Sequence, residues 1–419
     1  MSIISNKILT RKYGLWILFV IFLSYMVSFI DRTNVIVLIN DISFTDAFGI
    51  TANKATQGLL LTIFLLFSGI SAFFSGPIVN RFGARKSIGL VLVFSAVLMA
   101  IMGSISSFVI LLVCRALLGA SQVFLGPSTS KLVQSWFPVQ ERAKANGSWS
   151  IGMLVAQIIS MPLTTWMVTS TGWRGNFYIL ALISTIPFIF SILFIYNTPS
   201  KHPKVLKEDN DYITKSKVEE TTEISKSVNS FGFLKRSTFW YNAIVVSLIS
   251  AVNWGIVSWL PTYFMTTLRL SFAEMGFVSA LPYLFGAISI LSLTPLMDKF
   301  NSRAWFALIG LIGSGIMLFM AMNASNTTTA VAIFCLIFVF ILPITPSLYT
   351  IMQNTTEPNE VANAHGFLIG ISYVFASIFP YLIGVLYNYT GDLKYGFYLL
   401  ASILGIAILF CIPLIKRRL

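Results

Sequence analysis

The chain has 419 residues, of which 56% are hydrophobic and only 10% are charged, and its mean hydropathy is +0.82. A soluble domain averages about 25% charged residues, so this chain has too few to cover a water-facing surface. The net charge of +13 does not indicate a nucleic-acid partner, because the basic residues are spread through short segments between apolar runs.

Apolar runs of about 20 residues, the length that crosses a hydrocarbon core of about 30 Å, recur along the chain. They predict an all-α membrane protein with twelve transmembrane helices. We expect these near residues 14–38, 55–79, 87–106, 108–133, 146–170, 174–196, 239–266, 271–297, 304–323, 328–352, 361–389 and 395–415. The stretch between the sixth and seventh expected helices, residues 197–238, is rich in charged, Ser and Thr residues and predicts a solvated linker. The chain is therefore divided into an N-terminal bundle (1–196), a cytoplasmic linker (197–238) and a C-terminal bundle (239–419).

Basic residues are distributed unevenly between the two sides of the expected membrane. If the N-terminus is cytoplasmic, most of the 28 Lys and Arg lie in cytoplasmic segments, and the opposite face holds Lys54, Arg174, Arg269 and Lys394. This asymmetry follows the positive-inside rule and predicts that both termini are cytoplasmic. No cleavable signal is evident, because the first apolar run is too long for one. Short external loops favour a prokaryotic cytoplasmic membrane, with the protein in contact with the lipid bilayer.

The loops after the second and eighth expected helices share a pattern. Residues 76–86 read GPIVNRFGARK, and residues 294–303 read TPLMDKFNSR. Pro, a polar residue, a base, Phe and a final Arg recur at the same spacing. The repeat predicts two pseudo-symmetric six-helix bundles, with a binding site at the membrane midplane between them.

Charged residues inside the expected spans are the strongest functional signal. Of the 15 Asp and Glu, Asp31 alone lies well inside a span; Arg32 is beside it, and Arg115 lies in the fourth span. A charge at the bilayer centre costs about 2.5–3.5 kcal/mol or more, so the three must be offset by pairing, water or function. One reading is a structural Asp–Arg pair between helices one and four. However, one acid cannot neutralise two arginines, and a spare guanidinium suits a carboxylate ligand. Asp31 is then a candidate proton carrier.

Several polar and aromatic residues are weaker candidates for the cavity wall. Gln122 lies two helical turns after Arg115 on the same face. The others are Gln157, Asn253, Trp254, Trp259, Tyr263, Tyr283, Tyr349 and Tyr373. Helix packing or an interfacial position explains each of these equally well. His365 is read as structural.

Motifs of soluble enzymes are absent from the sequence, which contains no Walker loop, HExxH, GxSxG or CxxC. The cysteines Cys114, Cys335 and Cys411 lie in apolar runs without metal-ligand spacing. The sequence therefore predicts neither an enzyme nor a metal or organic cofactor.

The motifs resemble the major facilitator superfamily. The GPxxNRxGxRK loop is similar to its signature between helices two and three, and Arg115-Ala-Leu-Leu-Gly119 is similar to its helix-four RxxxG motif. A closer resemblance is to the anion:cation symporter family of sugar-acid and organic-anion carriers. It is carried by DRTN (31–34), WFPVQER (136–142), PLxxW (162–166) with GWRxxF (172–177), and WLPTY (259–263).

This resemblance implies roles for individual residues. Arg32 would hold the substrate carboxylate, Arg115 would organise the helix-four site, and Asp31 would exchange protons. Substrate contacts are expected from Arg32, Arg115, Gln122, Asn253, Trp254, Tyr263 and Tyr373. Conformational gating is expected from Gly76, Asn80, Arg81, Gly83, Arg85, Asp298 and Arg142.

The sequence departs from the family pattern at three positions. Gln122 stands where many proton-coupled members carry Glu, so a relay of two carboxylates cannot operate. Tyr373 stands where Asn is frequent, which implies a different substrate pocket. Asn80 stands where the signature normally has Asp, which removes a charge from the gating loop.

These observations predict a monomeric secondary transporter that moves a small organic anion, such as a sugar acid, by alternating access and proton symport. Because of Gln122, an exchanger, a facilitator or a Na⁺-coupled carrier remains an alternative. Export of drugs or metabolites is a further alternative with the same fold.

Overall fold

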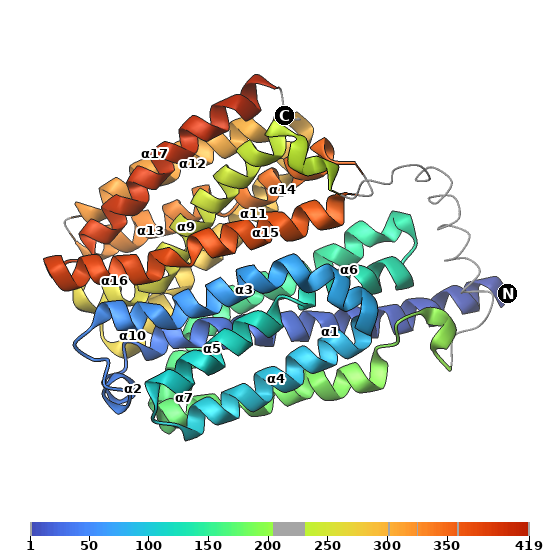
Figure 1. The fold of residues 1–419 in the computed structure, drawn as a ribbon, viewed down its shortest axis with the longest axis horizontal. Coiled ribbons are helices and arrows are strands. Elements are labelled where there is room, and N and C mark those ends of the chain that lie inside the picture. The colour runs from blue at the N-terminus through green and yellow to red at the C-terminus, as the bar shows by residue number, and fades with distance from the viewer. Residues whose placement is uncertain (1, 204–230, 301, 325, 358–359, 418–419) are drawn as a thin grey trace.

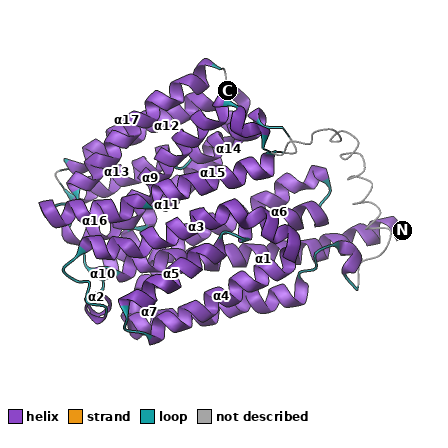
Figure 2. Cartoon of the chain, viewed as in Figure 1, coloured by secondary structure: helices purple, strands orange, loops and turns teal. Residues whose placement is uncertain are grey.

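The structure is a computed structural model that describes residues 2–203, 231–300, 302–324, 326–357 and 360–417. The described part is helical, with short loops and no strand (Figure 2). The helices are α1 (Ser2–Leu38), α2 (Ile42–Ala47), α3 (Lys54–Phe82), α4 (Ala84–Ser104), α5 (Phe108–Gln122), α6 (Leu125–Trp136), α7 (Val139–Phe194), α9 (Ser237–Thr266), α10 (Phe272–Val278), α11 (Ala280–Phe300), α12 (Arg303–Met322), α13 (Thr327–Ile341), α14 (Ile344–Thr355), α15 (Val361–Ala376), α16 (Ile378–Thr390) and α17 (Lys394–Lys416). Two short 3₁₀ helices are η1 (Pro199–Lys201) and η2 (Gly232–Lys235).

Eleven helices in the described part are long and apolar enough to cross a membrane. Ten of them coincide with single expected spans. The eleventh, Lys144–Phe194, has 51 residues and covers the fifth and sixth expected spans together. Within it, Gly172 has φ 72° and ψ 172°, which breaks the helix. Only glycine adopts such a backbone without strain, so this residue marks the turn between the two segments.

Four expected spans are each divided into two helices, and proline explains every division. Pro127, Pro282, Pro346 and Pro380 are each the third residue of the helix that follows the break, in α6, α11, α14 and α16. Proline has no N–H to donate, and the first four N–H groups of a helix have no partner within it. A proline is therefore tolerated in the first turn of a helix. It cannot donate to a carbonyl of the preceding helix, so the two helices do not join into one.

The helices pack into two groups, which we call the N-terminal half (α1–α7) and the C-terminal half (α9–α17). In the first, α1 and α4 pack along α7, and α3 packs along α5. In the second, α9 packs on α15 and α17, and α12 packs on α13 and α17. Figure 1 shows the blue-to-green helices together and the yellow-to-red helices beside them. Contact between the halves is made by α3 with α15 and α16, and by α7 with α10 and α11.

Small residues allow the two halves to approach closely. A Cβ at Gly58 of α3 would clash with the main chain at Pro380 of α16, and a Cβ at Gly69 would clash with the main chain of α15. Beside them, the Thr62 hydroxyl donates to the Ser377 carbonyl over 2.6 Å. Close packing of small residues replaces the hydrophobic effect as the source of helix association in lipid.

Large apolar side chains also cover the outside of the molecule. Leu90, Leu182, Ile309, Phe319 and Leu409 are between 52% and 68% exposed. A soluble monomer rarely exposes apolar patches of this kind, whereas hydrocarbon tails solvate them. The exposed apolar surface agrees with the predicted membrane environment.

Candidate substrate site

Asp31 and Arg32 are neighbours on α1, but their side chains point to different surroundings, since successive helical residues lie about 100° apart. Asp31 is fully buried in the N-terminal half, where its Oδ2 accepts a hydrogen bond from the Ser184 hydroxyl over 3.2 Å. Its Oδ1 has no hydrogen-bond partner in the described part. No ion pair joins Asp31 to an arginine among the described residues, so the reading as a structural Asp–Arg pair gains no support.

Arg115 binds main-chain carbonyls instead of an acid. Its Nε donates to the Leu60 carbonyl over 3.1 Å, Nη1 to the Asp31 carbonyl over 3.2 Å, and Nη2 to the Arg32 carbonyl over 3.0 Å. The side chain is 1% exposed, and its Cζ lies 4.8 Å from the centre of the Phe64 ring. This guanidinium therefore ties α5 to α1 and α3 and fixes the backbone that carries Asp31 and Arg32.

Arg32 has no such partners. No described residue accepts a hydrogen bond from its guanidinium, and its Nε is buried without a partner. Aromatic rings surround it: Cζ lies 5.3 Å from the centre of Phe64, 5.8 Å from Trp254 and 5.9 Å from Phe29. Such rings stabilise a cation without using its N–H donors. The planar fork of donors remains available to an anion.

The C-terminal half presents aromatic residues toward Arg32. Trp254 of α9 is 6% exposed, and its ring centre lies 6.2 Å from that of Tyr373 on α15, at 83°. From the N-terminal half, the Phe64 ring faces the same guanidinium. The Oδ1 atom of Asn253 is buried without a partner. Residues of the two halves thus meet around one guanidinium.

No hydrogen bond joins the other two predicted contact residues, Gln122 and Tyr263, to Arg32 in the described part. Gln122, at the end of α5, is 2% exposed, and neither its amide nitrogen nor its oxygen has a partner in the described part. Tyr263 lies within the C-terminal half, where its ring packs on Phe334 and Phe397 and its hydroxyl donates to the Ala321 carbonyl. No contact of Tyr263 with Arg32 is found in the described part.

With this geometry in view, the comparisons with known proteins identify the family. The family model described as Major Facilitator Superfamily matches residues 21–380 and 264–418. The chain belongs to this superfamily. It is therefore a multi-pass membrane transport protein and not an enzyme.

Several curated relatives of the chain are named as sugar-acid transporters. It is 22% identical to the "Probable L-galactonate transporter" of Escherichia coli (strain K12) over 410 residues, covering 95% of this chain and 88% of the relative. It is 23% identical to the "Hexuronate transporter" of Bacillus subtilis (strain 168), covering 97% and 94%. It is 27% identical to "Sialin" of Homo sapiens, covering 83% and 73%.

A solved transporter structure has the same fold. The chain matches a bacterial homolog of the human lysosomal transporter Spinster, in an inward-facing and unoccupied conformation, with a TM-score of 0.79 and 18% identity. The match covers 95% of this chain and 96% of that one.

The superfamily signature loop is braced by contacts within the N-terminal half. Gly83 has φ 82°, which allows the chain to turn between α3 and α4. The Arg85 N–H donates to Asn197 Oδ1 over 2.9 Å, and its guanidinium donates to the Ile192 carbonyl over 2.6 Å. Lys131 donates to Asn80 Oδ1 over 3.1 Å. These contacts join the loop to α6 and to the end of α7.

The remaining predicted gating residues are placed as follows. Arg81 is exposed near the end of α3, Gly76 has open space where a Cβ would be, and Arg142 donates from Nε to the Phe137 carbonyl over 3.3 Å. The side chain of Asp298 lies outside the described part, as does most of the predicted linker. Gating by these residues remains a prediction.

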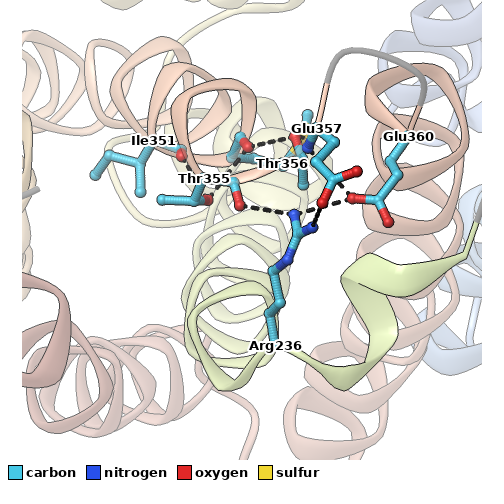
Figure 3. Close-up of polar contacts among 7 residues, drawn as sticks. Arg236, Ile351, Thr355, Thr356, Glu357 and Glu360 are labelled. Carbon is cyan, nitrogen blue, oxygen red and sulfur yellow. Dashed lines mark hydrogen bonds and ion pairs between the residues drawn. The ribbon is translucent and has the colours of Figure 1, made fainter. Parts of the chain in front are cut away.

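Sequence analysis missed a charged cluster at the start of α9. Arg236 makes ion pairs with Glu357 over 2.8 Å and with Glu360 over 2.9 Å, and it also donates to the Thr355 carbonyl over 3.0 Å (Figure 3). The Glu360 side chain is 2% exposed. The cluster ties α9 to the loop between α14 and α15. Arg236 is 119 or more residues away from its three partners, so no local sequence pattern predicts the cluster.

Proposed function

We propose that this protein is a secondary transporter that binds a small organic anion through Arg32 and moves it by alternating access. The observation that carries the proposal is the guanidinium of Arg32, which lies between the two halves with no hydrogen-bond acceptor among the described residues. A cation inside a membrane span needs either a counter-ion or carbonyl acceptors, and Arg32 has neither in the described part; a carboxylate matches the two-pronged donor geometry of Arg. The names of the relatives, which include sugar-acid carriers, support an organic anion such as a sugar acid.

The proposed topology has twelve membrane crossings in two six-helix halves, with both termini in the cytoplasm. It is supported by the 51-residue length of Lys144–Phe194, because one crossing needs about 20 residues. The glycine break within it would then be a short external turn. The distribution of Lys and Arg supports the orientation. We propose that the protein works as a monomer, because each chain contains both halves of the site.

We propose Asp31 as the group that couples transport to protons. It is the acid that the sequence places inside a span, it is buried, and one of its oxygens has no partner in the described part. The carboxylate makes no ion pair in the described part, so the oxygen without a partner is a place for a proton. Arg115 links the two functions, since it holds the carbonyls of both Asp31 and Arg32.

A rival proposal keeps the fold and the anion site but removes proton coupling. Gln122 cannot titrate, and both of its amide atoms lack partners in the described part. A carrier in which Gln122 takes the place of a second carboxylate could instead act as an exchanger or facilitator, or could use Na⁺. Export of a metabolite is the remaining alternative.

The test is reconstitution into liposomes that contain a pH-sensitive dye. Sugar acids, monocarboxylates, dicarboxylates and amino acids are added outside at fixed pH, and lumenal acidification is compared with protein-free vesicles. Acidification by one class of anion supports proton symport. Entry of a labelled anion without acidification overturns the coupling and favours the exchanger or facilitator.

The role of Arg32 is tested in the same vesicles. Arg32→Gln should abolish entry of the labelled anion, whereas Arg269→Gln, at an exposed position, should leave it unchanged. Normal transport by Arg32→Gln would refute the anion site.

A further inference from the structure

Among the described residues, one cation of the first and fourth expected spans has no hydrogen-bond acceptor. These spans, 14–38 and 108–133, contain Arg32, Arg115 and Lys131. The guanidinium of Arg115 donates to three carbonyls, and the Lys131 ammonium donates to the side chain and carbonyl of Asn80 and to the Val79 carbonyl. Arg32 alone of the three has no acceptor in the described part.

This count limits the charge of the ligand. A first carboxylate can pair with Arg32, but Arg115 and Lys131 already donate to protein acceptors in the described part and are not available to a second carboxylate. An unpaired charge inside a membrane span is strongly unfavourable, so the site favours a monoanion over a dianion.

The neighbours of Arg32 limit the shape of the ligand. The Trp254 ring centre lies 5.8 Å from the guanidinium carbon, and the Tyr373 ring stands at 83° to the indole. We call these two side chains the aromatic wall. A carboxylate held by Arg32 can place its carbon body against this wall, which is the part of the surroundings contributed by the C-terminal half.

A ring and an open chain behave differently against such a wall. A ring presents a flat face of C–H groups that can cover the indole without losing hydrogen bonds. An open-chain polyol turns hydroxyl groups toward the aromatic surface, and each hydroxyl that loses water without gaining a partner is penalised. Burying about 50 Å² of apolar face at ~25 cal/mol/Å² corresponds to roughly an eightfold gain in affinity.

We propose that Trp254 and Tyr373 determine specificity, and that they select monocarboxylates whose body is a ring over open-chain acids and dicarboxylates. The proposal rests on the proposed function in one respect, namely that the carboxylate binds Arg32. Two kinds of molecule share this chemistry, the pyranose form of a uronic acid and an aryl carboxylic acid.

The experiment measures the dissociation constants of four probes by calorimetry on the purified full-length protein. Glucuronate and gluconate have the same charge and similar size, and they differ in ring against open chain. Glucarate adds a second carboxylate to the open chain, and benzoate provides an aryl ring. We expect glucuronate or benzoate, or both, to bind at least fivefold more tightly than gluconate, and glucarate to bind weakest. If glucuronate binds more tightly than benzoate, the substrate is a pyranose; if benzoate binds more tightly, it is an aryl acid.

Variants test the aromatic wall directly. Trp254→Leu should bring glucuronate and gluconate to within about twofold of each other. The control is Trp305→Leu, the same change at a side chain of α12 that is 54% exposed, and it should keep the wild-type order. If Trp254→Leu does not fold, the order of the four probes on the wild-type protein decides alone.

The outcomes separate this inference from the proposed function. If gluconate or glucarate binds as tightly as glucuronate and benzoate, and Arg32→Gln still abolishes their binding, the aromatic wall is refuted and the anion site stands. If Arg32→Gln binds the same acids as the wild type, both are refuted.

Discussion

The contrast between Arg115 and Arg32 gives a quantitative prediction for two Arg→Lys variants. Arg115 makes three hydrogen bonds to carbonyls of α1 and α3, at 3.0–3.2 Å. A hydrogen bond to a charged group contributes about 1.5–3 kcal/mol, and a single ammonium nitrogen cannot reach all three carbonyls. If one or two are lost, Arg115→Lys should lower the free energy of unfolding by about 2–5 kcal/mol. Arg32→Lys should change it by less than about 1 kcal/mol, because no described residue accepts from Arg32.

Binding should show the opposite order. Arg32→Lys removes the two-pronged donor that faces the anion, so the dissociation constant for the best-bound carboxylate should rise at least about tenfold. Folded Arg115→Lys should bind the same ligand within a few-fold. Unfolding is measured by chemical denaturation in mixed micelles, and binding by calorimetry. If Arg115→Lys unfolds like the wild type but loses binding, Arg115 contacts the ligand and the reasoning from its carbonyl partners is wrong.

Three further predictions concern coupling, movement and stability. Asp31→Asn should retain exchange of labelled anion between vesicles and medium but lose accumulation driven by a pH gradient; accumulation equal to wild type would remove Asp31 from the coupling step. Gly58→Ala, which adds a Cβ against the main chain of α16, should slow vesicle transport at least about tenfold. The control Gly405→Ala, with no atom within 4 Å of its Cβ, should not slow it. Equal transport rates in the two variants would show that the contact of α3 with α16 is not closely packed during transport. Glu360→Gln should lower the free energy of unfolding by about 1–3 kcal/mol, because Arg236 loses a buried partner; unchanged denaturation would mean that Glu357 alone satisfies Arg236.

Local sequence patterns predicted the helices well. Each expected span coincides with a long apolar helix or with part of one, because hydrophobic length depends only on the residues of that segment. The division of four spans was not predicted, although its cause, a proline in the third position after the break, is visible in the sequence. The short helix α2 was also missed. It has six residues and is capped by Asp41, whose side chain accepts from the Ser43 N–H.

The candidate site was predicted in part. Asp31, Arg32 and Arg115 stood out because charges inside apolar runs are costly. Their different surroundings could not be read from the sequence, since adjacent residues on a helix face different neighbours. Tyr263 was grouped with the cavity residues, and the structure instead packs it with Phe334 and Phe397.

The sequence by itself determined that the chain lies in a membrane, where its helices fall, and which interior charges need an explanation. These conclusions depend on composition and on spacing along one chain segment. Only the tertiary structure decided which arginine is engaged and which is available, because the partners of Arg115 are carbonyls 55 or more residues away. It also decided that Arg32 of one half meets Trp254 of the other. Contacts of this kind depend on how the two halves pack, and no local pattern records that packing.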